Sequence, residues 1–78
     1  MTDPFRIEHA NKVKASADEL RAIAMAGNNA SALEWAGKAE FIADEAIRAY
    51  QSDDLAAGDE LFRGASTALE RASAALAA

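Results

Sequence analysis

Few side chains in this chain are of types that do acid–base, nucleophilic or metal chemistry, and they are not spaced as a site. His9 is the single histidine, and cysteine is absent, so no disulfide or thiolate chemistry is available. On a helical wheel His9 lies on an apolar face, while the nearby acids Asp3 and Glu8 point elsewhere. Metal sites need several converging ligands, so we expect no metal here. For His9 we expect a partly buried, hydrogen-bonded side chain, and a pH-sensitive contact is the alternative.

A cluster of acids around the second predicted turn is the other group that could bind an ion. It consists of Asp53, Asp54, Asp59 and Glu60. Calcium loops place oxygen ligands at alternating positions around a turn glycine and end in a bidentate glutamate, and this turn is too short for that pattern. We expect helix caps and a solvated face, with an acidic patch for a basic partner as the alternative.

Catalytic motifs are missing as well. The chain has no glycine-rich phosphate loop and no Ser/His/Asp set, and its carboxylate pairs lie on the wet faces of predicted helices. The sequence therefore predicts a protein that is not an enzyme, has no catalytic residue and binds no cofactor.

The net charge of −5 is unevenly distributed along the chain. Residues 1–27 carry four acids and four bases, whereas residues 28–78 carry nine acids and four bases. A surface that binds phosphates needs clustered Lys and Arg, so we expect no nucleic-acid partner. No apolar run approaches the ~18–20 residues of a membrane span, and the first residues do not start a signal peptide. We expect a cytoplasmic protein with no membrane partner, and leaderless export stays open.

Apolar spacing predicts three amphipathic helices, at about 4–26, 31–51 and 53–77. Their similar lengths and the short turns between them favour antiparallel neighbours. We predict a single all-α domain over residues 1–78, a small antiparallel three-helix bundle with up-down-up order.

Residues typical of helix ends support these boundaries. Asp3-Pro4 opens the first helix, and Gly27-Asn28-Asn29 ends it because these residues tolerate the left-handed conformation. Ser31-Ala32-Leu33-Glu34 has the pattern of a capping box for the second helix, and Ser52-Asp53-Asp54 caps the third.

Each predicted helix has a face that we expect to be buried. In the first helix this face contains Phe5, His9, Val13, Ala17, Leu20, Ile23 and Ala24. In the second it is a broad arc from Trp35 to Tyr50. In the third it is a heptad stripe that consists of Leu55, Gly58, Phe62, Ala65, Leu69, Ala72 and Leu76. We expect its large members, Leu55, Phe62, Leu69 and Leu76, in the core. Because Gly58 and the alanines make this helix smooth, close packing within the chain and close packing across a homodimer both stay open.

Phe41 is the residue that breaks the pattern of its helix. It lies on the polar side of the second helix, where Lys38, Glu45 and Arg48 surround it. A three-helix arrangement could place this ring against the first helix. Aromatic side chains are also enriched at the centres of protein interfaces. We therefore predict a contact patch for a partner protein at Phe41, Lys38, Glu45 and Arg48.

Trp35-Ala36-Gly37 resembles the Trp-x-Gly motif of the small helical-hairpin substrates of type VII secretion, which are short, leaderless, alanine-rich and often dimeric. Tyr50 and Asp54 reproduce the Tyr-x-x-x-Asp spacing of that family's export signal. In the family, Trp-x-Gly lies in the turn between two long helices. The resemblance therefore implies a secreted protein with Trp35 and Gly37 in an interhelical turn, whereas the capping pattern places Trp35 inside the second helix.

The function that the sequence favours is a non-catalytic protein–protein interaction module, such as a small adaptor, an assembly subunit or an inhibitor that occupies a partner's surface. One alternative is a secreted Trp-x-Gly-like protein. A second is a helix-turn-helix DNA-binding domain, against which the missing basic patch argues.

Overall fold

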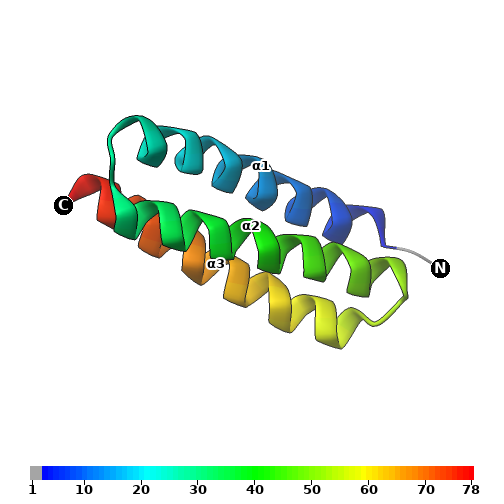
Figure 1. Ribbon diagram of the computed structural model, residues 1–78. Coiled ribbons are helices and arrows are strands. Elements are labelled where there is room, and N and C mark those ends of the chain that lie inside the picture. The colour runs from blue at the N-terminus through cyan, green and yellow to red at the C-terminus, as the bar shows by residue number, and fades with distance from the viewer. Residues whose placement is uncertain (1–2) are drawn as a thin grey trace.

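The computed structural model describes residues 3–78, and these residues form three long helices: α1 (Pro4–Ala26), α2 (Ala30–Gln51) and α3 (Leu55–Ala77). The helices alternate in direction, so α1 and α3 run parallel to each other and antiparallel to α2 (Figure 1). The body measures 42 × 16 × 14 Å. The predicted all-α three-helix bundle is confirmed. No helix among residues 3–78 combines the length and the apolar character needed to cross a membrane.

The helices begin and end close to the predicted boundaries, and the capping residues are as predicted for α1 and α3 but not for α2. The Asp3 carboxylate accepts hydrogen bonds from the backbone N–H groups of Phe5 and Arg6. Asn29, not Ser31, caps α2: its Oδ1 accepts from the N–H of Ala32. The capping-box prediction was therefore wrong, because Asn29 is the residue with extended backbone before the helix.

Residues in the left-handed conformation end the first two helices. Asn28 has φ 53° and Asp53 has φ 60°, whereas Gly27 keeps a negative φ. Because Asp53 has the left-handed conformation that ends α2, the next residue, Asp54, caps α3. The helix α3 therefore begins at Leu55 instead of residue 53. Asn and Asp tolerate this conformation better than other non-glycine residues.

The core is built mainly from alanine. Every residue that is wholly or nearly wholly buried over most of the bundle is small: Ala10, Ala17 and Ala24 on α1; Ala32, Ala36, Ala39, Ala43 and Ala46 on α2; Gly58, Ala65, Ala68 and Ala72 on α3. The residues on α1 repeat every seven positions, and those on α2 repeat every three or four. Side chains of this size let helix backbones approach closely, so each contact is tight although little apolar area is buried.

The predicted core face of α1 was partly wrong. Phe5 is 74% exposed and Ile23 is 50% exposed, and His9 is exposed as well. The helix is rotated so that its alanine line, not its large side chains, faces α2. On α3 the small members of the heptad stripe are buried, while Leu55, Phe62, Leu69 and Leu76 are half-buried at its flank.

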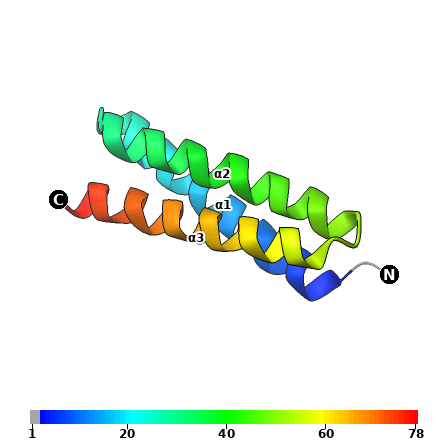
Figure 2. The ribbon, with the colours of Figure 1, turned by 90° about the horizontal axis from the view of Figure 1, so that it is seen from below.

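The helix α2 is central, because it packs along both neighbours while α1 and α3 touch each other much less. Figure 2 shows α2 and α3 side by side, with α1 passing behind them. Near the C-terminal end of α2 the small side chains give way to Ile47 and Tyr50. Tyr50 is 1% exposed and is the largest fully buried side chain of the described residues.

The absence of a side chain at Gly58 leaves the space that the Tyr50 ring occupies. A Cβ atom at position 58 would lie 2.3 Å from Cε1 and 2.4 Å from Cδ1 of the Tyr50 ring, which is closer than real contacts allow. The ring is enclosed and cannot swing away. Glycine in mid-helix costs ~1 kcal/mol relative to alanine, and here the packing of Tyr50 offsets that cost.

We expect Gly58→Ala to lower the free energy of unfolding by about 1–3 kcal/mol, because the new methyl group overpacks the Tyr50 site. Gly37→Ala is the matched control, since a Cβ at that position meets nothing within 4 Å. It should raise stability by ~0.5–1 kcal/mol through helix propensity alone. Urea unfolding followed by circular dichroism measures both. Equal effects of the two substitutions would contradict the close Gly58–Tyr50 contact.

Candidate functional site

The predicted contact patch lies on the outward side of α2. Phe41 is 67% exposed, so the expectation that its ring could lie against α1 was wrong. Lys38 and Arg48 are exposed, and Glu45 is half-buried. We call the surface formed by Gly37, Lys38, Phe41, Glu45 and Arg48 the α2 outer face. Each of the other four positions is three, four or seven residues from Phe41, so they surround its ring on one side of the helix.

The charged side chains of the α2 outer face pair with neighbours on the same helix. Lys38 Nζ lies 3.2 Å from Glu34 Oε1. The two Nη atoms of Arg48 contact Asp44 Oδ2 at 3.0 Å and Glu45 Oε1 at 2.6 Å. The charges around Phe41 are therefore oriented by contacts within the chain.

Asp44 also ties this surface to α1. Lys14 Nζ donates to Asp44 Oδ1 at 3.0 Å. This hydrogen bond and the charge of Lys14 hold the pKa of the Asp44 carboxyl below its usual range. The carboxylate is therefore ionised at neutral pH and positions both Lys14 and Arg48.

A shallow, open hollow of about 380 Å³ lies beside Phe41, between α1 and α2. Its lining is Lys14, Arg21, Gly37, Glu40, Phe41 and Asp44. Glu40 Oε2 is buried without a hydrogen bond, and its nearest cation is Arg21 Nη1 at 3.6 Å. The absence of a side chain at Gly37 keeps this hollow open next to the Phe41 ring.

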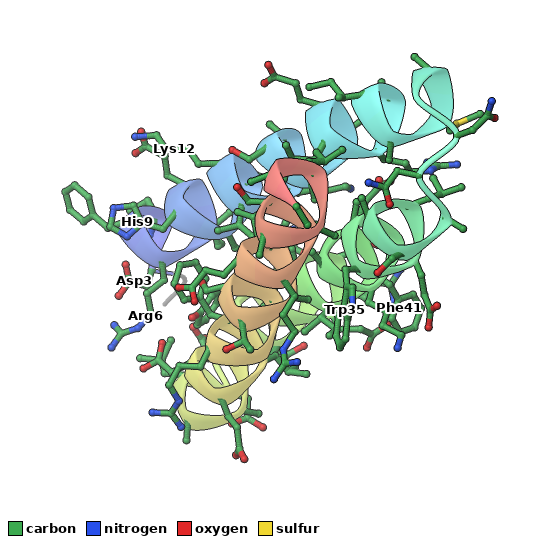
Figure 3. All side chains as sticks on the ribbon, turned by 90° about the vertical axis from the view of Figure 1, so that its left-hand side faces the viewer. Asp3, Arg6, His9, Lys12, Trp35 and Phe41 are labelled. Carbon is green, nitrogen blue, oxygen red and sulfur yellow. The ribbon has the colours of Figure 1, made fainter. Side chains whose placement is uncertain are left out.

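Trp35 is a residue of this surface that the site prediction missed. Lys38 Nζ lies 4.5 Å and Arg71 Cζ 5.0 Å from the centroid of its ring, both within cation–π range. Figure 3 shows Trp35 and Phe41 on the same side of the bundle, away from His9 and Lys12. The position of Trp35 on the helical wheel predicted a core residue, and one part of its side chain does pack against the buried cluster that contains Ala39 and Ala68. No spacing pattern in the sequence could reveal that Arg71 of α3 reaches the ring.

The expectation drawn from the Trp-x-Gly resemblance was wrong. Trp35 and Gly37 lie inside α2, and the turn between α1 and α2 is at residues 27–29. Tyr50, the residue at the position of the export tyrosine, is buried in the bundle. Neither motif is therefore presented as the resemblance implies.

A second polar cluster joins all three helices at the other end of the bundle. Arg6 donates from Nε to Asp59 Oδ1 at 2.9 Å and from Nη2 to Oδ2 at 3.2 Å. Its Nη1 contacts Asp3 Oδ2 at 2.6 Å. The Tyr50 hydroxyl donates to Asp59 Oδ1 at 2.7 Å. Asp3, Arg6, Tyr50 and Asp59 form what we call the terminal clamp. Sequence spacing could not reveal it, since Arg6 and Asp59 are far apart along the chain.

The terminal clamp shifts the pKa of each member. The hydrogen bond from Arg6, then that from Tyr50, lowers the pKa of Asp59. Hydrogen bonds from the backbone and side chain of Arg6 lower the pKa of Asp3. Burial, then the bond to Asp59, raises the pKa of Tyr50 to about 12. All of these shifts favour the pairing present at neutral pH, so the cluster is arranged to hold helices together.

His9 opens onto the same hollow as the terminal clamp, of about 370 Å³, and is exposed. It is therefore not the partly buried histidine that we expected. Within residues 3–78, no three His, Asp or Glu side chains lie close enough together to hold a metal ion. The acids around the second turn serve the fold in part: Asp54 caps α3 and Asp59 belongs to the terminal clamp.

We expect the phenolate absorbance of Tyr50, the only tyrosine, to titrate near pH 12 in the folded chain and near pH 10 in urea. A raised pKa means that this group stabilises the fold fully below about pH 10 and that its contribution is lost between about pH 10 and 12. Wild type should therefore lose more stability over this range than Tyr50→Phe, with the single tryptophan, Trp35, as the fluorescence reporter. A native-state titration near pH 10 would contradict the buried clamp.

Comparison of the chain with protein-family models, with curated proteins and with solved structures found no match.

Proposed function

We propose that this protein is a non-catalytic protein–protein interaction module that binds a partner protein through the α2 outer face. The observation that carries this proposal is the exposure of the Phe41 ring, 67%, in the middle of a helix whose other large side chains are at least half-buried. The Phe41 ring is not part of the core, so removing it should change the free energy of unfolding only slightly.

The surroundings of Phe41 suit an interface. Partner surfaces that form stable complexes have an aromatic or apolar centre with a polar rim. Here Lys38, Glu45 and Arg48 make that rim, and ion pairs along α2 already orient their charges. Because the backbone under the ring is helical, binding would restrict only the side-chain angles of Phe41 and its neighbours.

The adjacent hollow indicates the kind of partner. Its lining carries two cations, Lys14 and Arg21, and two carboxylates, Glu40 and Asp44. A partner of mixed charge that offers an apolar pocket for the Phe41 ring fits this surface.

The DNA-binding alternative has less support. Among residues 3–78, six of the eight Lys and Arg side chains lie within ion-pair distance of a carboxylate: Arg6, Lys12, Lys14, Arg21, Lys38 and Arg48. Cations that are already paired make a weak phosphate-binding surface. A small adaptor, an assembly subunit or an inhibitor remains the function that the exposed surface supports best.

We expect Phe41→Ala to abolish partner capture while changing the unfolding free energy by less than about 0.5 kcal/mol, as for other exposed positions. The measurement is a pull-down from the native source with quantitative mass spectrometry, run beside thermal unfolding of each variant. Proteins retained by the wild type and lost from Phe41→Ala are the candidate partners.

Met25→Ala is the matched control, because Met25 is also a large apolar side chain that is mostly exposed, but on α1. It should retain the same partners as the wild type. Identical protein sets for the wild type and Phe41→Ala, or equal losses in both variants, would count against the α2 outer face.

A further inference from the structure

The space between α1 and α3 is a second surface that the bundle leaves open. The two helices run side by side but touch little, since both pack on α2 instead. Half-buried Leu20 of α1 and half-buried Leu69 of α3 line the same hollow in this space. Half-buried Val13 and Phe62 each lie seven residues earlier on these parallel helices, so they share the next level along the space. Ile23, 50% exposed, continues the apolar line of α1. We call this surface the α1–α3 groove.

Charged residues at the rim of the groove are arranged in two bands. Glu19 and Glu70 line the same hollow of the groove, so they lie at the same level. Lys12 and Arg63 each precede these acids by seven residues, two helical turns, on parallel helices. They therefore share a level about 10 Å away, on the same side of their helices. All four side chains are exposed, and Figure 3 shows Lys12 on the side of the bundle away from Phe41.

We propose that the occupant of the α1–α3 groove is a second copy of this chain, packed antiparallel. A two-fold axis across the groove, between the two bands, places Lys12 of one copy opposite Glu19 of the other. It places Arg63 opposite Glu70 in the same way. The small side chains of Ser16 and Ser66 lie near this axis and let the helices approach.

The charges at the rim favour an antiparallel dimer over a parallel one. In a parallel dimer, Lys12 would face Arg63 of the second copy, and Glu19 would face Glu70. Like charges opposite each other oppose association, whereas the antiparallel arrangement pairs every one of the four with an opposite charge. The face made by α1 and α3 runs the 42 Å length of a body 14–16 Å wide. A footprint of that size is of the order of the ~800 Å² per partner that stable interfaces bury.

This dimer is independent of the α2 outer face. The groove lies between α1 and α3, and Phe41 projects from the far side of α2. Both copies would therefore present a Phe41 surface, so the dimer would be a bivalent binding module.

The test is the mass in solution, by sedimentation equilibrium or light scattering over a range of concentrations. Wild type should pass from 8.2 kDa to twice that mass as concentration rises. Lys12→Glu and Glu19→Lys should each weaken the dimer about tenfold or more, because each puts like charges opposite at both ends of the axis. An equimolar mixture of these two variants should regain the dimer mass. In the mixed dimer one chain has Glu at both positions 12 and 19 and the other has Lys at both, so opposite charges again face each other.

Lys38→Glu is the matched control. It breaks an i,i+4 pair with Glu34 on α2, as Lys12→Glu breaks one with Glu8 on α1. It should leave the dimer unchanged, and so should Phe41→Ala, which keeps this proposal separable from the proposed function. Circular dichroism of every variant verifies the fold.

Three results would overturn the proposal. A wild-type monomer at all concentrations would mean that a helix of another protein, or nothing, covers the groove. A dimer that persists in both charge variants would place the interface elsewhere. Failure of the mixture to regain the dimer mass would exclude the antiparallel register.

Discussion

The helix α2 meets both of its neighbours through side chains no larger than alanine for most of its length, and the rest of the structure depends on this close contact. A buried alanine contributes little transfer free energy. The contacts of α2 with α1 and α3 are therefore stabilised by dispersion between closely approaching helices. Such contacts fall off steeply with distance. The rotation of each helix about its own axis is therefore tightly specified, and that rotation decides which side chains reach the surface.

Close alanine packing has a second consequence, because large side chains must lie at its edges. Leu55, Phe62 and Leu69 flank the seam of α3, and Phe5 and Ile23 of α1 remain exposed. A single core of this size supplies only ~3–5 kcal/mol, so apolar surface left at the flanks is available for association. Because the core is built from alanine, large apolar side chains remain at the surface, both in the α1–α3 groove and on the α2 outer face.

The terminal clamp and Tyr50 compensate for the narrow core at one end of the bundle. There the small side chains stop, and a buried aromatic ring fills the space over Gly58. Arg6, Asp59 and Tyr50 join the three helices through hydrogen bonds that charge strengthens. At the opposite end a single side chain has a comparable role: Asn29 caps α2 and donates from Nδ2 to the carbonyl oxygen of Ala75 at 3.1 Å.

The sequence by itself determined the helices, their order and their approximate ends, because periodicity and capping act within a few residues of each position. It also singled out Phe41, since a large apolar residue among charges is visible on a wheel. Ala17 and Ala24 were on the predicted buried face, but only the tertiary structure decided that Ala10 joins them against α2 and that Phe5 and His9 do not. A helical wheel identifies the most hydrophobic face of a helix. The face that packs in this bundle is instead the one whose small side chains allow the closest approach of the neighbouring backbone. The same limit hid Trp35, whose second cation comes from another helix, and the pairing of Arg6 with Asp59. Contacts between residues so distant in sequence exist only once the helices have packed.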